Sequence, residues 1–169
     1  MAATIEIRSY HEAGGSTPDS GVDKAGGSVR FKAADNDTVD AATSIVIPAA
    51  LDAYSFLKQF RFYNSTVPSN SIDNLKFYME GSNDYGTGIS LQCKQEASWT
   101  NPVTLGSADV TGCTDAFTYT SGSPLTITGS WSSSTGPFGN YLKIQMKVHH
   151  DAAQGTTSSE NMVFAYDES

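Results

Sequence analysis

Apolar side chains recur at every second position in short runs along almost the whole chain. The run Leu142, Ile144, Met146 and Val148 is the clearest, because polar residues fill the positions between its members. Side chains of a β-strand alternate between two faces, so this spacing predicts strands that each bury one face. Comparable runs begin at Ile5, Val29, Ile45, Tyr54, Leu75 and Ile89.

Clusters of Gly, Ser, Thr, Asn, Asp and Pro separate these runs, as in HEAGGSTPDSGVDKAGGS and GSWSSSTGPFGN. Such clusters are typical of turns. About eight to ten short strands without a long helical pattern predict an all-β fold, an antiparallel β-sandwich of jelly-roll or immunoglobulin-like type. A small barrel is the alternative, and the wide Cys, Trp, Cys spacing of a true immunoglobulin domain is absent.

A length of 169 residues predicts one domain. Within it we expect a flexible N-terminal arm or loop over residues 1–28, which includes the first strand. Residues 29–169 are expected to form the β-sandwich itself. The Gly-rich stretch between His11 and Ser28 is the longest predicted loop, and we expect it to become ordered against a neighbouring molecule.

The charge balance disfavours two classes of partner. Lys and Arg number 10 against 18 Asp and Glu, which gives a formal charge of -8, and the basic residues are scattered. Because binding to nucleic acid depends on Lys and Arg that neutralise phosphates, nucleic acid is not an expected partner. Anionic membranes are disfavoured for the same reason.

The two cysteines are interpreted as separate residues. Cys93 continues the alternating run of Ile89 and Leu91, so we predict a small side chain in the core, not a disulfide with Cys113.

The acidic stretch around residues 34–40 contains a weak candidate for a metal site. Asp35, Asp37 and Asp40 supply oxygen atoms, yet the stretch lacks the glycine and distal glutamate of an EF-hand, so a solvated turn is favoured. His149 and His150 are adjacent and are expected on opposite faces of a strand, where they cannot share one ion. We therefore predict no metal and no cofactor.

No pattern in the sequence indicates catalysis. A G-x-S-x-G nucleophile elbow is absent, and the pair Glu80 and Asp84 flanks a predicted turn. We therefore expect a binding protein, not an enzyme.

Four aromatic residues fall in or beside predicted loops: Tyr85, Trp99, Trp131 and Phe138. Aromatic side chains in loops either contact a partner or cap the ends of the core, and the sequence favours neither interpretation.

Three segments of the chain resemble a known class of protein. The strings FKAADNDTVD, FRFYNSTVPSNSIDNLKFYMEGSNDYGTGISLQCK and FGNYLKIQMKVHHDAAQGTTSSENMVFAYDE look like small proteins encoded among the virion structural genes of tailed bacteriophages. The resemblance runs from about Val29 to the C-terminus and involves no catalytic signature.

The resemblance implies a capsid decoration or cement protein. Such a protein is made in the host cytoplasm and binds the outer capsid surface, where its partners are the major capsid protein and copies of itself, expected as a homotrimer. A tail, neck or baseplate component and a carbohydrate-binding β-sandwich that recognises a receptor are the alternatives. The expected contact residues are the N-terminal arm, Ala2 to Asp23, and Tyr10, His11, Tyr85, Trp99, Trp131 and Phe138.

Overall fold

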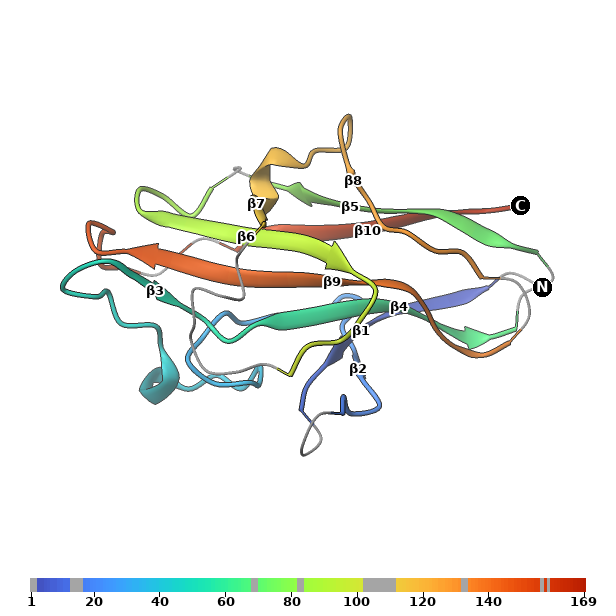
Figure 1. The fold of residues 1–169 in the computed structure, drawn as a ribbon, viewed down its shortest axis with the longest axis horizontal. Helices are drawn as coiled ribbons and strands as arrows, with labels where there is room; N and C mark the ends of the chain where they lie inside the picture. Colours follow the sequence, from blue (N-terminus) through green and yellow to red (C-terminus); the bar gives the residue numbers. More distant parts are fainter. Residues whose placement is uncertain are drawn as a thin grey trace.

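The protein is a sandwich of two antiparallel β-sheets packed face to face, which confirms the predicted fold class (Figure 1). No helix in the described part of the chain is long and apolar enough to cross a membrane. The computed structural model describes residues 3–12, 17–67, 70–81, 84–101, 112–131, 134–155, 157 and 159–169.

The two sheets differ in size. The larger has the order β2-β1-β4-β9-β6-β7 with β3 beside β9, and the smaller has the order β10-β5-β8. The larger contains β1 (Thr4–Tyr10), β2 (Val22–Asp23), β3 (Asp52–Tyr54), β4 (Lys58–Thr66), β6 (Ile89–Glu96), β7 (Thr114–Asp115) and β9 (Gly136–His149). The smaller contains β5 (Ile72–Glu80), β8 (Leu125–Thr126) and β10 (Asn161–Glu168), and short 3-10 turns cover Ala41–Thr43 and Ala116–Thr118.

The connectivity favours the jelly-roll alternative. From β4 onward the chain crosses between the sheets at nearly every step, with only the β6 to β7 step remaining in one sheet. An immunoglobulin domain instead keeps several consecutive pairs of strands within one sheet. Jelly rolls are double-sheet sandwiches, and this chain follows that arrangement.

The core lies where the middle strands of the two sheets face each other. Phe164 of β10 contacts Phe60 and Phe62 of β4 and Phe77 of β5, with ring centroids 5.3 to 6.0 Å apart. Leu142 on β9 is fully buried in the same cluster. The period-two runs therefore fill the core as the sequence predicted, since each strand turns one row of side chains inward.

Two of the predicted strands do not form. The runs that begin at Val29 and Ile45 lie in irregular structure, although these side chains still pack against the core. Backbone groups here bond outside any sheet: Arg30 N–H donates to Asp37, and Ala33 N–H donates to the Thr43 carbonyl.

Residues 1–28 contain the expected first strand, β1, but its pairing makes the described part of this range a part of the sandwich and not a separate arm. All of β1 pairs with β4, from Thr4 opposite Thr66 to Tyr10 opposite Gln59, and β2 pairs with β1. The inward Ile5 and Ile7 pack against the core, which makes β1 a structural strand. Ala2 and residues 13–16 of the expected arm lie outside the described residues.

Cys93 is a buried core residue on β6, as predicted. Burial raises the pKa of the Cys93 thiol to about 12, so the folded protein holds it in the neutral form.

A close crossing of the backbone supplies the first test of the fold. Gly129 has φ of 132°, and a Cβ atom there would overlap the Gly139 backbone. We expect Gly129→Ala to lower the free energy of unfolding by about 3 kcal/mol, because it adds overlap and strain together. Urea denaturation measures this change. Gly155→Ala is the control, since Gly155 has no atom within 4 Å of its Cβ position, and equal effects would contradict the crossing.

Candidate functional site

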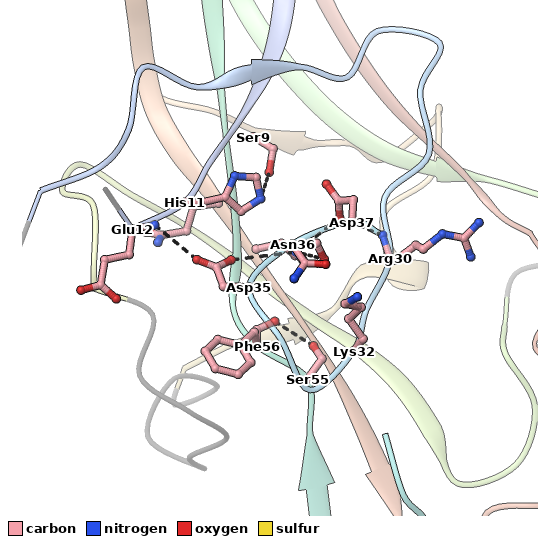
Figure 2. A network of polar contacts seen from close by, with 12 residues as sticks. Ser9, His11, Glu12, Arg30, Lys32, Asp35, Asn36, Asp37, Ser55 and Phe56 are labelled. Atoms are coloured by element: carbon pink, nitrogen blue, oxygen red, sulfur yellow. Dashed lines mark hydrogen bonds and ion pairs between the residues drawn. The ribbon is translucent and has the colours of Figure 1, made fainter. Parts of the chain in front are cut away.

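The connection between β2 and β3 includes a long stretch, residues 29–51, that contains no strand and only the short turn Ala41–Thr43. We call it the anchored segment, because buried charged groups bind residues 35–37 to the rest of the protein. We call this bound part of the segment its base. Figure 2 shows this base, where Asp35, Asn36 and Asp37 lie close to Lys32 and Arg30.

Lys58 is the main anchor. It begins β4, pairs with Ile144 of β9 and is fully buried. Its ammonium nitrogen lies 3.0 Å from the Asn36 carbonyl oxygen, 3.3 Å from Asp37 Oδ1 and 3.9 Å from Asp35 Oδ1. The only polar residue in the alternating run from Tyr54 to Phe62 thus binds the acidic stretch instead of packing against the smaller sheet.

Further contacts close the base from both sides. Lys24, which follows β2, lies 2.7 Å from Asp37 Oδ2, and Arg30 N–H donates to Asp37 Oδ1 at 3.1 Å. Lys32 donates to the Thr38 carbonyl at 2.7 Å, while its own carbonyl accepts from Phe56 N–H at 2.9 Å. The segment is therefore bonded to residues before and after it in the chain.

The end of β1 joins the same network. Glu12 N–H donates to Asp35 Oδ2 at 3.3 Å (Figure 2). His11 lies 3.4 Å from the Ser9 hydroxyl and 3.6 Å from Asp19, so its ring is held in place on the sheet.

The charges at the base compensate one another. Burial alone would raise the pKa of Asp37, but the hydrogen bond from Lys24 and the charge of Lys58 outweigh it and hold that pKa below its ordinary value of 3.8. Burial lowers the pKa of Lys58, and Asp37 and Asp35 oppose that effect. A buried charge of this kind requires its partners, so the base is a coupled unit.

The three candidate metal ligands have other tasks in this structure. Asp35 and Asp37 face Lys58, and Asp40 caps the turn Ala41–Thr43 by accepting from Ala42 N–H. Within the described residues no group of three or more His, Cys, Asp or Glu is arranged to hold a metal ion.

The expectation that His149 and His150 point to opposite faces is wrong. Their ring centroids lie 4.1 Å apart, because β9 ends at His149 and the chain turns at His150.

Above its base the anchored segment exposes aliphatic side chains. Val39, Val46 and Leu51 are 77%, 78% and 81% exposed. Val39 and Val46 border a shallow groove of about 550 Å³ whose walls include Ile45 and Ile47. A segment that is fixed at its base and apolar at its surface is suited to bind another molecule with little loss of conformational entropy.

Three of the predicted contact residues are buried in the described structure and are corrected here. Tyr10 stacks edge-on against Tyr141, and Phe138 is a residue of β9 that packs on Phe62. Trp131 exchanges two backbone hydrogen bonds with Ile72 and also contacts Phe138. Phe138 and Trp131 belong to the core because their backbone continues the sheets, whereas Tyr10 and Tyr141 pack on each other outside the core cluster.

The other three predicted contact residues are partly buried. Tyr85 stacks on Phe117 at 5.3 Å, Trp99 precedes the Thr100 that bonds to Gln59, and His11 belongs to the network at the end of β1. His11 lies near the base of the anchored segment (Figure 2), and Tyr85 lines a groove together with Val29 and Phe31 of that segment.

Comparisons with protein-family models, with curated proteins and with solved structures found no match to this chain. Sequence reasoning also missed the exposed aliphatic residues, since Val39 stands alone between polar residues and Val46 lies between Ile45 and Ile47, in an apolar run that predicts a strand. The available signal was Lys58, the charged residue that interrupts the apolar run from Tyr54 to Phe62.

Replacing the anchor tests the base. We expect Lys58→Met to lower the free energy of unfolding by about 3 kcal/mol, because it leaves buried carboxylates without their partner. It should also speed protease cleavage within residues 29–51. The control is Lys147→Met, which breaks a more exposed pair with Asp52 and should cost less than about 1 kcal/mol. Equal losses in the two variants would contradict the role of Lys58.

Acid should weaken the ion pairs that Asp37 makes at the base of the anchored segment. The pKa of Asp37 is lower in the folded state than its ordinary value, so its contribution is complete above about pH 4 and is lost as the pH falls through the folded pKa. Urea denaturation between about pH 2 and 5 should show a shallower loss of stability for Asp37→Asn than for the unchanged protein. Identical slopes would show that Asp37 is not coupled to the two lysines.

Proposed function

We propose that this protein is a structural component of a tailed-bacteriophage virion, a capsid decoration or cement protein. It binds the outer shell across neighbouring capsid subunits through the anchored segment and stabilises the shell. The observation that carries the proposal is the set of exposed aliphatic residues Val39, Val46 and Leu51 on a segment whose base is fixed by buried ion pairs. The resemblance of the sequence to phage virion proteins supplies the class of partner.

The physical requirements of a cement protein agree with this arrangement. It must bind a repeating surface by modest contacts that symmetry multiplies. Each contact can be weak if the binding segment loses little conformational entropy when it binds. The base around Lys58 and Asp37 supplies that order in advance. The partners in this proposal are the major capsid protein and copies of the chain itself, arranged as a trimer at local three-fold positions.

The net charge of -8 suits a protein that accumulates before assembly. Like charges on separate copies repel one another and limit premature association.

Carbohydrate recognition is not proposed as a second function. That alternative relied on Trp99 or Trp131 as a platform for a sugar ring, and Trp131 is buried between the sheets. A position on the tail, neck or baseplate is distinguished by the experiment below.

The test is reconstitution. Purified protein is mixed with capsids of the encoding phage that lack it, followed by sedimentation and electron microscopy. We expect saturable, symmetric density on the shell. We expect Val39→Ser with Val46→Ser to weaken binding by about tenfold or more without loss of stability, because two exposed apolar contacts are removed.

The matched control carries Val22→Ser with Val67→Ser, two valines that are each 50% exposed outside the anchored segment. This variant should bind as the unchanged protein does. Density confined to the tail would overturn the capsid position, and equal weakening by both double variants would overturn the role of the anchored segment.

A further inference from the structure

The outer edge of β10 has no partner strand in the described part of the chain. β10 is the terminal strand of the smaller sheet and pairs with β5 from Asn161 opposite Glu80 to Glu168 opposite Ile72. At eight residues it is long for an edge, whereas β2, β7 and β8 have two residues each. Long unpaired edges are templates for another strand, and natural proteins usually protect them.

The free backbone groups on this edge follow from the hydrogen bonds of β5. Leu75 accepts from Ile127 and Met79 donates to Tyr119, so from Leu75 to Met79 the odd-numbered residues of β5 turn their backbone groups away from β10. Backbone groups alternate in direction along a strand, so Lys76 and Tyr78 face β10. Their partners on β10 include Val163 and Ala165. The groups of Met162 and Phe164 therefore point to the open side.

A groove of about 900 Å³ lies along this open side. β10 forms one wall, and Ile5 and Ile7 of β1 with Val29 and Phe31 of the anchored segment line the remainder. The groove exists because the sheets are unequal: β10 packs over β4, and β1, the next strand of the larger sheet, extends past it. Half-buried aliphatic side chains of β1 thus face a space that a further strand would cover.

On the wall opposite β10, backbone groups of residues 29–33 make hydrogen bonds to residues outside the groove. Arg30 N–H donates to Asp37, the Lys32 carbonyl accepts from Phe56, and Ala33 N–H donates to Thr43. These bonds and the anchor at Lys58 hold residues 29–33 in place, so the wall does not need to close on β10 to satisfy its backbone.

The topology leaves one strand position open at the same place. A jelly roll has two sheets of about four strands each. Here β4, β9, β6 and β7 form four neighbours of the larger sheet, whereas the smaller sheet, as far as the structure describes the chain, contains β10, β5 and β8. The missing position is beside β10.

Charge decides what kind of strand fits. Glu80 and Glu160 lie at the start of β10, and Asp167 and Glu168 lie at its end. Two copies of β10 paired antiparallel would bring acidic residues together at both ends, so a second copy is disfavoured. The groove is lined by two basic residues, Lys24 and Arg30, and Lys24 is already paired with Asp37. The acidic residues at both ends of β10 therefore favour a strand with basic residues at its ends.

We infer that the edge of β10 binds an extended segment of another protein, with apolar side chains at alternate positions and basic residues at its ends. The segment adds a fourth strand to the smaller sheet by backbone hydrogen bonds to Met162 and Phe164, and its apolar side chains cover Ile5 and Ile7. The inference goes beyond the capsid proposal and does not depend on it.

The first experiment uses three fluorescein-labelled peptides and the full chain. The probe is Lys-Thr-Val-Thr-Val-Thr-Val-Lys; a second peptide replaces both lysines by Glu, and a third has the three valines in one block. We expect fluorescence anisotropy to show saturable binding of the first with a Kd of about 100 µM or tighter. The other two should bind at least about tenfold more weakly. The first peptide should also slow hydrogen exchange at the amides of Met162 and Phe164.

Two variants separate this site from a general effect on folding. Met162→Pro removes an N–H that faces the open side and should weaken binding by about tenfold, because the sheet itself does not use that donor. Asp167→Lys with Glu168→Lys should shift preference toward the glutamate peptide, a result that a misfolded protein cannot produce.

Two results would overturn the inference. One is the absence of saturable binding at about 1 mM of the first peptide, or equal binding of the peptide with blocked valines. The other is slow exchange of the Met162 and Phe164 amides in the free protein, which would show that residues 29–31 already close on β10. Neither result bears on capsid binding, since no capsid is used.

Discussion

The burial of Lys58 is the constraint on which the arrangement of the proposed binding surface depends. An ammonium group inside a sandwich is tolerated only if oxygen atoms surround it, and the chain supplies them from Asp35, Asn36 and Asp37. Because these three residues are consecutive, the side chain of Lys58 determines the path of residues 29–51, which have almost no secondary structure of their own. Lys24 then joins Asp37 to the end of β2, and the N-terminal strands are brought into the same unit.

The unequal size of the two sheets determines how the inner face of β1 is covered. A large sheet packed on a small one buries the middle strands completely and leaves the inner face of β1 partly covered by irregular structure. The two surfaces proposed for binding lie on either side of this irregular structure: the exposed aliphatic residues of the anchored segment and the groove beside β10. Both follow from the same fact, that residues 29–51 take the place of regular sheet without pairing as a strand.

Much of the fold could be predicted from the spacing of apolar residues, and the reasons for the failures are specific. β9 alternates almost perfectly, and β4, β5 and β6 are each visible as period-two runs, since a half-buried strand leaves that pattern whatever its partners are. The run at Val29 has the same pattern but no strand, because a pattern reports which side chains are buried and not where the backbone hydrogen bonds go. Trp131 and Phe138 stand beside glycine-rich turns, and only the pairing with Ile72 and Phe62 shows that they belong to the core. The candidate site was visible only in part: the acidic stretch was noticed, but its partners Lys58 and Lys24 are distant in sequence.

The two ends of the described chain lie side by side. Ala3 N–H donates to the Glu168 carboxylate, Ser71 and Ser169 exchange backbone hydrogen bonds, and both ends emerge at the same tip of the sandwich (Figure 1). The ends could therefore be joined by a short linker and the chain reopened at a surface turn. Such a change would alter the order of the strands along the chain but not their positions in space. The anchored segment lies toward the other tip (Figure 1), so a cargo fused to either end would be carried away from it. A sandwich built in this way can display a foreign domain outward while its opposite tip stays free to bind.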